Sequence, residues 1–209
     1  EIQIVNFIKK NINRFKSLIV SDYSKGFLTP HLLEKVIKIF RDNNKKIFTD
    51  PKNKDISIYK GSSYICPNQS EFNDFFNYEK LKINKKSIIK LIKKIKSDAF
   101  IVTKGSEGIT ILSKDKKTID IPQESVNVYD VTGAGDTFIA FFSYLMSNNI
   151  DVVNSLRISS YACIKIVQKK HTATLNFKEF KELIDKFCSE TNIDLNLKVK
   201  LWKLSKSKI

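Results

Sequence analysis

Hydrophobic and polar residues follow two alternating patterns along the chain. Short apolar runs that end in polar turns comprise residues 17–21, 46–49, 63–66 and 99–103. Between them lie stretches in which apolar residues recur every three or four positions. Such runs predict buried strands and such spacing predicts helices, and their alternation is typical of a parallel sheet with covering helices.

Local signals mark where several helices begin. Thr29 is a good N-cap with Pro30 at the first helical position, and the apolar spacing then continues to Asn43. Asn84 is placed to cap a second helix. Residues 109–112 and 118–121 predict an antiparallel pair, and three more helices are expected from about residues 133, 151 and 177. The expected class is α/β.

Length and composition limit the architecture. With 209 residues, 42% of them hydrophobic, the chain can fill one core but is short for two full domains. We expect one unit over residues 1–190 and a basic tail or truncated linker over 191–209. The chain opens at Glu1 directly into an apolar stretch, without an initiator methionine. The beginning of the protein is therefore expected to be missing.

The charge and the apolar runs narrow the classes of partner. The net charge is +15, but the excess is nearly all lysine spread along the whole chain, which favours a general residue bias over a specific nucleic-acid surface. The most apolar run, residues 138–146, is too short to span a bilayer. Cys66, Cys163 and Cys188 are scattered, which predicts free thiols. We expect a cytoplasmic protein that binds neither membrane nor specific nucleic acid.

The chemistry concentrates in residues 130–138, Asp-Val-Thr-Gly-Ala-Gly-Asp-Thr-Phe. Gly133, Ala134 and Gly135 let the backbone approach a ligand, and a helix that begins there points free N–H groups at an anion. Asp136 would stand beside this anion hole, placed to accept a proton from an attacking hydroxyl. Neither a P-loop nor a GxGxxG turn is present. A plain glycine-rich helix start with a capping aspartate remains the structural alternative.

This stretch resembles the carboxyl-terminal signature of the PfkB, or ribokinase, family of carbohydrate kinases. The resemblance implies a ribokinase-like three-layer αβα sandwich with a mostly parallel central sheet, here without its amino-terminal strands and β lid. It implies that Asp136 is the catalytic base and that Gly133, Ala134 and Gly135 form the anion hole. Asp130 and Thr132 would then lie where many relatives hold a monovalent cation such as K⁺.

Two upstream segments resemble the nucleotide side of the same family. Asn68 and Glu71 match an N-x-x-E motif that organises Mg²⁺ near the ATP phosphates, although Asn68 could equally be a helix cap. Thr103, Gly105 and Gly108 lie in a segment that resembles the strand end facing the nucleotide. Without the family, that segment is only a strand and a tight turn.

Three further segments resemble heptose 7-phosphate kinases, the kinase half of the bifunctional enzymes that make ADP-heptose. They are residues 20–26, 49–52 and 59–61. Asp22, Lys25 and Lys52 lie within them, just after predicted strand ends, where α/β proteins bind ligands. Either lysine would suit a phosphate group, and either could be a solvated surface charge.

The implied activity is ATP-dependent phosphorylation of a sugar hydroxyl. The substrate would be the anomeric hydroxyl of D-glycero-D-manno-heptose 7-phosphate, in ADP-heptose and lipopolysaccharide core synthesis. ATP, Mg²⁺ and a sugar phosphate are the expected partners, with a homodimer at full length. Another PfkB sugar or nucleoside kinase, or a non-catalytic nucleotide-binding or basic interaction module, are the alternatives. Without the lid, these residues alone are expected to be weakly active or inactive.

Overall fold

A computed structural model describes residues 1–115, 117–123, 129–169, 174–191 and 193–206. The chain divides into two compact units, Glu1–Glu124 and Ser125–Ile209. Each unit is described separately below.

The first unit is built on a six-stranded sheet in which the strands follow one another in chain order. The strands are β1 (Ser17–Ser21), β2 (Lys46–Asp50), β3 (Tyr64–Ile65), β4 (Ala99–Thr103), β5 (Ile109–Ser113) and β6 (Thr118–Ile121). β1 to β4 are parallel, whereas β5 and β6 run antiparallel to their neighbours. The carboxyl ends of β1 to β4 therefore meet at a single edge of the sheet.

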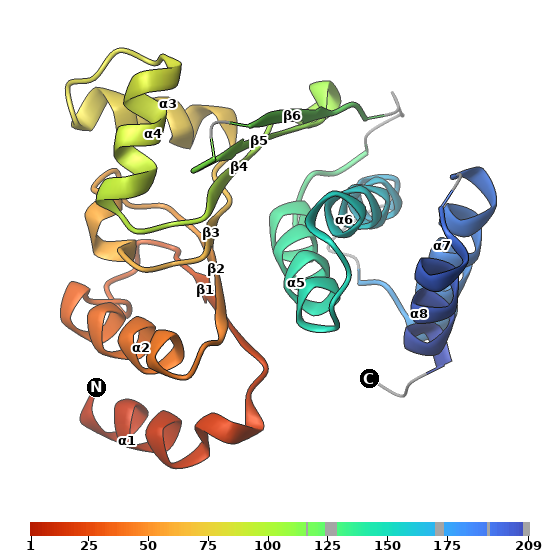
Figure 1. Ribbon diagram of the computed structural model, residues 1–209, viewed down its shortest axis with the longest axis horizontal. Coiled ribbons are helices and arrows are strands. Elements are labelled where there is room, and N and C mark those ends of the chain that lie inside the picture. The colour runs from red at the N-terminus through yellow and green to blue at the C-terminus, as the bar shows by residue number, and fades with distance from the viewer. Residues whose placement is uncertain (116, 124–128, 170–173, 192, 207–209) are drawn as a thin grey trace. The chain divides into compact units, whose positions relative to one another are not determined.

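Helices cover one face of β1 to β4 (Figure 1). They are α1 (Ile2–Asn11), α2 (Pro30–Asp42), α3 (Gln69–Tyr78) and α4 (Lys85–Lys94), with the short 3₁₀ segments η1 (Ile12–Arg14) and η2 (Ile56–Tyr59). A third 3₁₀ segment, η3 (Gly105–Glu107), forms the turn between β4 and β5. Their apolar faces form one core with the sheet, to which Leu33, Phe75 and Ile92 contribute from helices and Ile47 and Phe100 from strands. This core fixes the strand ends that carry most of the candidate residues.

The expected caps and strands are present in this unit. The Thr29 side chain accepts a hydrogen bond from Leu32 N (3.1 Å), and Pro30 opens α2. The Asn84 side chain accepts one from Ser87 N (3.0 Å) at the start of α4. β1 and β4 have the predicted bounds, while β3 is two residues long because only Tyr64 and Ile65 pair with both neighbours.

The second unit is helical. It comprises α5 (Ala134–Ser147), α6 (Val152–Val167), α7 (Phe177–Glu190) and α8 (Leu195–Lys206). Buried residues from all four helices, among them Leu145, Ala162, Phe187 and Leu201, form one apolar cluster. α8 occupies the stretch expected to be a basic tail or linker, and its Leu197 and Leu201 are buried in this cluster.

Among the helices that the structure describes, none is long and apolar enough to cross a membrane.

Candidate functional site

Four candidate residues of the first unit lie at the carboxyl edge of the parallel strands. Asp22 follows β1 and its backbone N–H donates to Asp50 O (3.0 Å) at the end of β2. Asn68 follows β3 and forms a β-bridge with Thr103, the last residue of β4. Lys52 lies two residues beyond the end of β2. The sheet thus brings together residues as far apart in the chain as Asp22 and Thr103, which are separated by 81 positions.

A buried hydroxyl links two of these segments. Asp22 is 6% exposed, and its carboxylate accepts hydrogen bonds from Ser24 N (2.7 Å) and from the Tyr59 hydroxyl. The same Tyr59 oxygen accepts from Lys52 N (3.2 Å) and Asn53 N (3.0 Å). Burial, reinforced by the hydrogen bond to Asp22, raises the pKa of Tyr59 above its ordinary value. Tyr59 therefore stays neutral and fixes Asp22 against the loop that carries Lys52.

This role of Tyr59 was not predicted from the sequence, where the residue appeared only within a family-like segment. A tyrosine in a short apolar stretch signals burial, but the sequence does not show which carboxylate its hydroxyl reaches.

Asn68 and Glu71 form a capping box at the start of α3. The Asn68 side chain accepts from Glu71 N (2.9 Å), and the Glu71 carboxylate accepts from Asn68 N (2.9 Å). The other Glu71 oxygen forms an ion pair with Lys52. Asn68 is therefore a helix cap in the structure, as the alternative interpretation predicted. Capping leaves the two residues able to bind water as well, through the Asn68 amide nitrogen and the remaining lone pairs of Glu71.

The remaining candidates of the first unit lie in loops. Lys25 is exposed between β1 and α2, and within the described part of the chain it has no ion-pair partner. Gly105 has a positive φ of 58° and open space where a side chain would point. Gly108, at φ 90°, is held tightly, since a Cβ atom there would lie 2.1 Å from Ile121 O. This close packing is by itself sufficient to require glycine at position 108.

In the second unit, the glycine-rich segment opens α5. Gly133 is the N-cap, in the left-handed region at φ 81°, and it gives the helix no side-chain cap. A Cβ atom built at Gly133 or Gly135 meets nothing within 4 Å. The start of α5 is therefore open to a close-approaching ligand. Asp136 is exposed in the first helical turn.

Two neighbours support this helix start. Asp130 accepts a hydrogen bond from Thr132 N (2.8 Å), and Asp130 N donates to Val167 O (3.3 Å) at the end of α6. The Cys163 thiol, on α6, donates to Ala134 O (3.2 Å). Burial raises the pKa of Cys163 to about 12, so the thiol stays protonated and can make this contact. Cys163 was predicted only as a free thiol, and all three cysteines are free.

The described part of the chain contains no cluster of three or more His, Cys, Asp and Glu side chains that could hold a metal ion directly. A magnesium ion bound to nucleotide phosphates and water would fit this donor set, because Mg²⁺ keeps several waters and needs few protein ligands. Asn68 and Glu71 are the residues whose oxygen and amide groups could hold those waters.

Comparison with known proteins identifies the family. Residues 7–178 match the pfkB family of carbohydrate kinases. The chain belongs to this family. It is 34% identical over 184 residues to the bifunctional protein HldE of Aliarcobacter butzleri, which covers 86% of this chain and 38% of that protein. The family resemblance drawn from the motifs is thereby confirmed. The chain spans about two fifths of the length of such relatives.

Solved structures show the same fold at low sequence identity. Phosphofructokinase-2 from Escherichia coli, in complex with potassium, matches with a TM-score of 0.70 and 13% identity over 88% of this chain and 62% of its own. A candidate ribokinase II from the same organism, in complex with ATP and Mg²⁺, matches with a TM-score of 0.69 and 17% identity over 85% and 61%. The expected ribokinase-like α/β fold with a mostly parallel sheet is confirmed.

Proposed function

We propose that the chain carries the nucleotide-binding and phosphoryl-transfer residues of a sugar kinase that uses ATP to phosphorylate the anomeric hydroxyl of a heptose 7-phosphate. Family membership supports the reaction class. The heptose substrate is supported by the segments 20–26, 49–52 and 59–61 and by the similarity to HldE proteins. On this proposal the reaction serves ADP-heptose and lipopolysaccharide core synthesis.

The observation that carries the proposal is the open start of α5. Phosphoryl transfer needs donors that steady the charge on the transferring group and a base beside the attacking hydroxyl. Gly133 and Gly135 would supply backbone donors at a helix N-terminus without a side-chain cap, and Ala134, whose N–H donates to Val131 O (3.1 Å), would join them by exchanging that bond for the phosphoryl group. Asp136, exposed in the same turn, would accept the proton of the sugar hydroxyl. Asp130 and Thr132 would hold a monovalent cation, K⁺ by analogy with the potassium complex of phosphofructokinase-2.

The sheet edge of the first unit would serve ATP and the sugar phosphate. Asn68 and Glu71 would orient the waters of Mg²⁺, which supplies charge neutralisation at the ATP phosphates. Thr103 and Gly105 would face the nucleotide, as would Gly108, whose tight packing also shapes the turn. Lys52, held by Glu71 at this edge, would bind a phosphate, and Lys25 would reach one from its exposed loop. Asp22, immobilised by Tyr59, would position the sugar.

The experiment is calorimetric titration of the chain with ATP in the presence of Mg²⁺. A Gly135→Val variant should lose binding, because its side chain would fill the open space at the start of α5. Ala140→Val, at an exposed position of the same helix, is the control for the helix propensity of valine and should bind normally. Unchanged ATP affinity in folded Gly135→Val would overturn the anion hole.

Turnover tests the base and the sugar separately. In a longer version of the protein that restores the expected lid, Asp136→Asn should keep ATP binding and lose phosphorylation by a factor on the order of 10² to 10⁴, the usual contribution of a general base. Heptose 7-phosphate should be preferred to ribose and fructose 6-phosphate in a competition assay. Strong turnover by these 209 residues alone would contradict the weak activity expected of them.

A further inference from the structure

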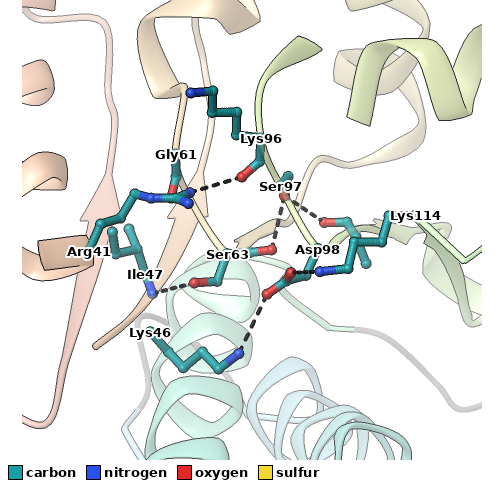
Figure 2. A network of polar contacts seen from close by, with 10 residues as sticks. Arg41, Lys46, Ile47, Gly61, Ser63, Lys96, Ser97, Asp98 and Lys114 are labelled. Carbon is teal, nitrogen blue, oxygen red and sulfur yellow. Dashed lines mark hydrogen bonds and ion pairs between the residues drawn. The ribbon is translucent and has the colours of Figure 1, made fainter. Parts of the chain in front are cut away.

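A second polar region lies at the opposite edge of the same sheet, where the parallel strands begin. Its centre is Asp98, directly before β4, whose carboxylate pairs with Lys114 Nζ (2.6 Å) and Lys46 Nζ (3.4 Å). Figure 2 shows these two lysines reaching Asp98 from two sides, and Arg41 bridging to the carbonyl oxygens of Gly61 and Lys96. Because β4 is five residues long, this edge lies about 13 Å from the edge that carries Thr103.

The region is a cavity of about 760 Å³, a size typical of small-molecule sites. Six basic residues line it: Arg41, Lys45, Lys46, Lys93, Lys96 and Lys114. Only two acidic residues, Asp98 and Asp115, line it as well, so its formal charge is six minus two, or +4.

The basic side chains are held in different ways. Burial alone would raise the pKa of Asp98, but the hydrogen bond from Lys114 and the charge of Lys46 outweigh burial and lower it. Asp98 therefore stays ionised and orients both lysines. Arg41 is fixed by its two carbonyl contacts, each 3.0 Å long. Lys93 and Lys96 are exposed, and no carboxylate of the described residues lies within ion-pair distance of either.

The helix C-termini at this edge explain why some of the basic residues lie here, but they do not explain all of the positive charge of the cavity. α2 and α4 both end at this edge, and lysines near a helix C-terminus offset its partial negative charge. Lys45, Lys46 and Lys114, however, lie on strand starts and loops rather than in the last turn of a helix. Like charges gathered in one concave space repel one another, and a bound anion relieves that repulsion.

We propose that this cavity binds a compact polyvalent anion of the inorganic polyphosphate class, such as inorganic triphosphate. The six cationic groups line a single hollow at one edge of the sheet, which favours a compact ligand over a nucleic-acid strand, because a strand needs a groove that follows its backbone. The site shares no residue with those proposed for phosphoryl transfer and does not depend on their roles.

The test is titration of the folded chain with inorganic triphosphate at about 150 mM salt, where exposed charges are well screened. Replacing both Lys93 and Lys96 with glutamine should weaken binding about tenfold, the order expected from removing two charges near a polyanion. Asp115→Asn should strengthen binding, because it removes a negative charge from the cavity lining.

Two controls make the outcome specific. Lys9→Gln with Lys10→Gln removes the same charge from the last turn of another helix, outside the cavity, and should leave the affinity unchanged. Gly135→Val, which targets the proposed anion hole, should also leave triphosphate binding at this cavity intact.

Equal weakening by the Lys9 and Lys10 pair would show diffuse attraction and overturn the site. Loss of binding in Gly135→Val would assign the anion to the start of α5 instead. Binding of a single-stranded oligonucleotide that depends on Lys93 and Lys96, without binding of triphosphate, would overturn the compact ligand.

Discussion

At the scale of single residues, the Tyr59 hydroxyl makes three hydrogen bonds. It donates to the Asp22 carboxylate and accepts from the backbone N–H groups of Lys52 and Asn53. A Tyr59→Phe variant removes the donor to Asp22 and the acceptor for Lys52 N and Asn53 N. Leaving such groups unsatisfied should lower the free energy of unfolding by about 1–3 kcal/mol. Urea denaturation followed by circular dichroism measures the change.

Tyr78→Phe is the matched control, since Tyr78 is 55% exposed, and it should change the stability by less than about 0.5 kcal/mol. The raised pKa of Tyr59 also sets a direction with pH. The stabilisation is fully present below the unfolded-state pKa, about 10, and is lost as the pH rises further. A Tyr59→Phe variant as stable as the parent would show that water replaces the hydroxyl.

Gly108 and Gly105 separate steric need from ligand contact. Both have positive φ, but only Gly108 abuts the backbone of Ile121 and Gln123. Gly108→Ala should lower the free energy of unfolding by about 3 kcal/mol, and Gly105→Ala by about 1 kcal/mol, the usual cost of a side chain in that backbone region. Thermal denaturation compares the two. Equal losses would mean that the turn relaxes around a methyl group at position 108.

At the scale of elements, α3 allows the two roles of Asn68 to be tested apart. Serine caps a helix as well as asparagine does but lacks the amide group. Asn68→Ser should therefore keep stability within about 0.5 kcal/mol while weakening Mg²⁺-dependent ATP binding. Asn68→Ala should lose about 1 kcal/mol of stability as well. Calorimetry and urea denaturation give the two quantities.

The control lies at the start of α7, which has the same capping box, made by Asn176 and Glu179. Asn176→Ser should change neither stability nor nucleotide binding. If Asn68→Ser also leaves nucleotide binding unchanged, then Asn68 is a cap alone and the magnesium role is wrong.

Elements with strong local signals were predictable from the sequence. The bounds of β1 and β4 and the capped start of α2 follow from apolar runs and from Thr29 and Pro30. For α3 the sequence analysis predicted only a turn that Asn68 could cap, and it did not predict the length of the helix, although the buried Phe72, Phe75 and Phe76 have helical spacing. α8 was not predicted because its many lysines indicated a basic tail, although Leu197 and Leu201 are buried in the apolar cluster of the second unit.

The candidate site was predictable as a set of positions and not as a network. Motifs located Asp22, Lys52 and Glu71 separately. The Tyr59 bridge between Asp22 and the Lys52 loop, and the pair of Lys52 with Glu71, join residues 19 to 37 positions apart. Such contacts depend on how parallel strands align at one edge, which periodicity does not encode.

At the scale of the whole molecule, the net charge of +15 raises the affinity of the chain for anions in general. A polyanion held by diffuse lysines releases counterions on binding, so its affinity falls steeply with salt. A nonspecific oligonucleotide should therefore lose at least tenfold in affinity between about 50 and 200 mM salt, irrespective of sequence. Fluorescence anisotropy over a salt series measures this slope.

ATP with Mg²⁺ should behave differently if the proposed site holds it. Backbone N–H groups at the start of α5 are fixed dipoles without condensed counterions, and Mg²⁺ already neutralises much of the phosphate charge. Its affinity should thus change by less than about threefold over the same salt series. The difference between the two slopes separates a built nucleotide site from general attraction. Oligonucleotide binding that is insensitive to salt and selective for sequence would instead support a specific nucleic-acid site. A general residue bias would then no longer explain the lysine excess.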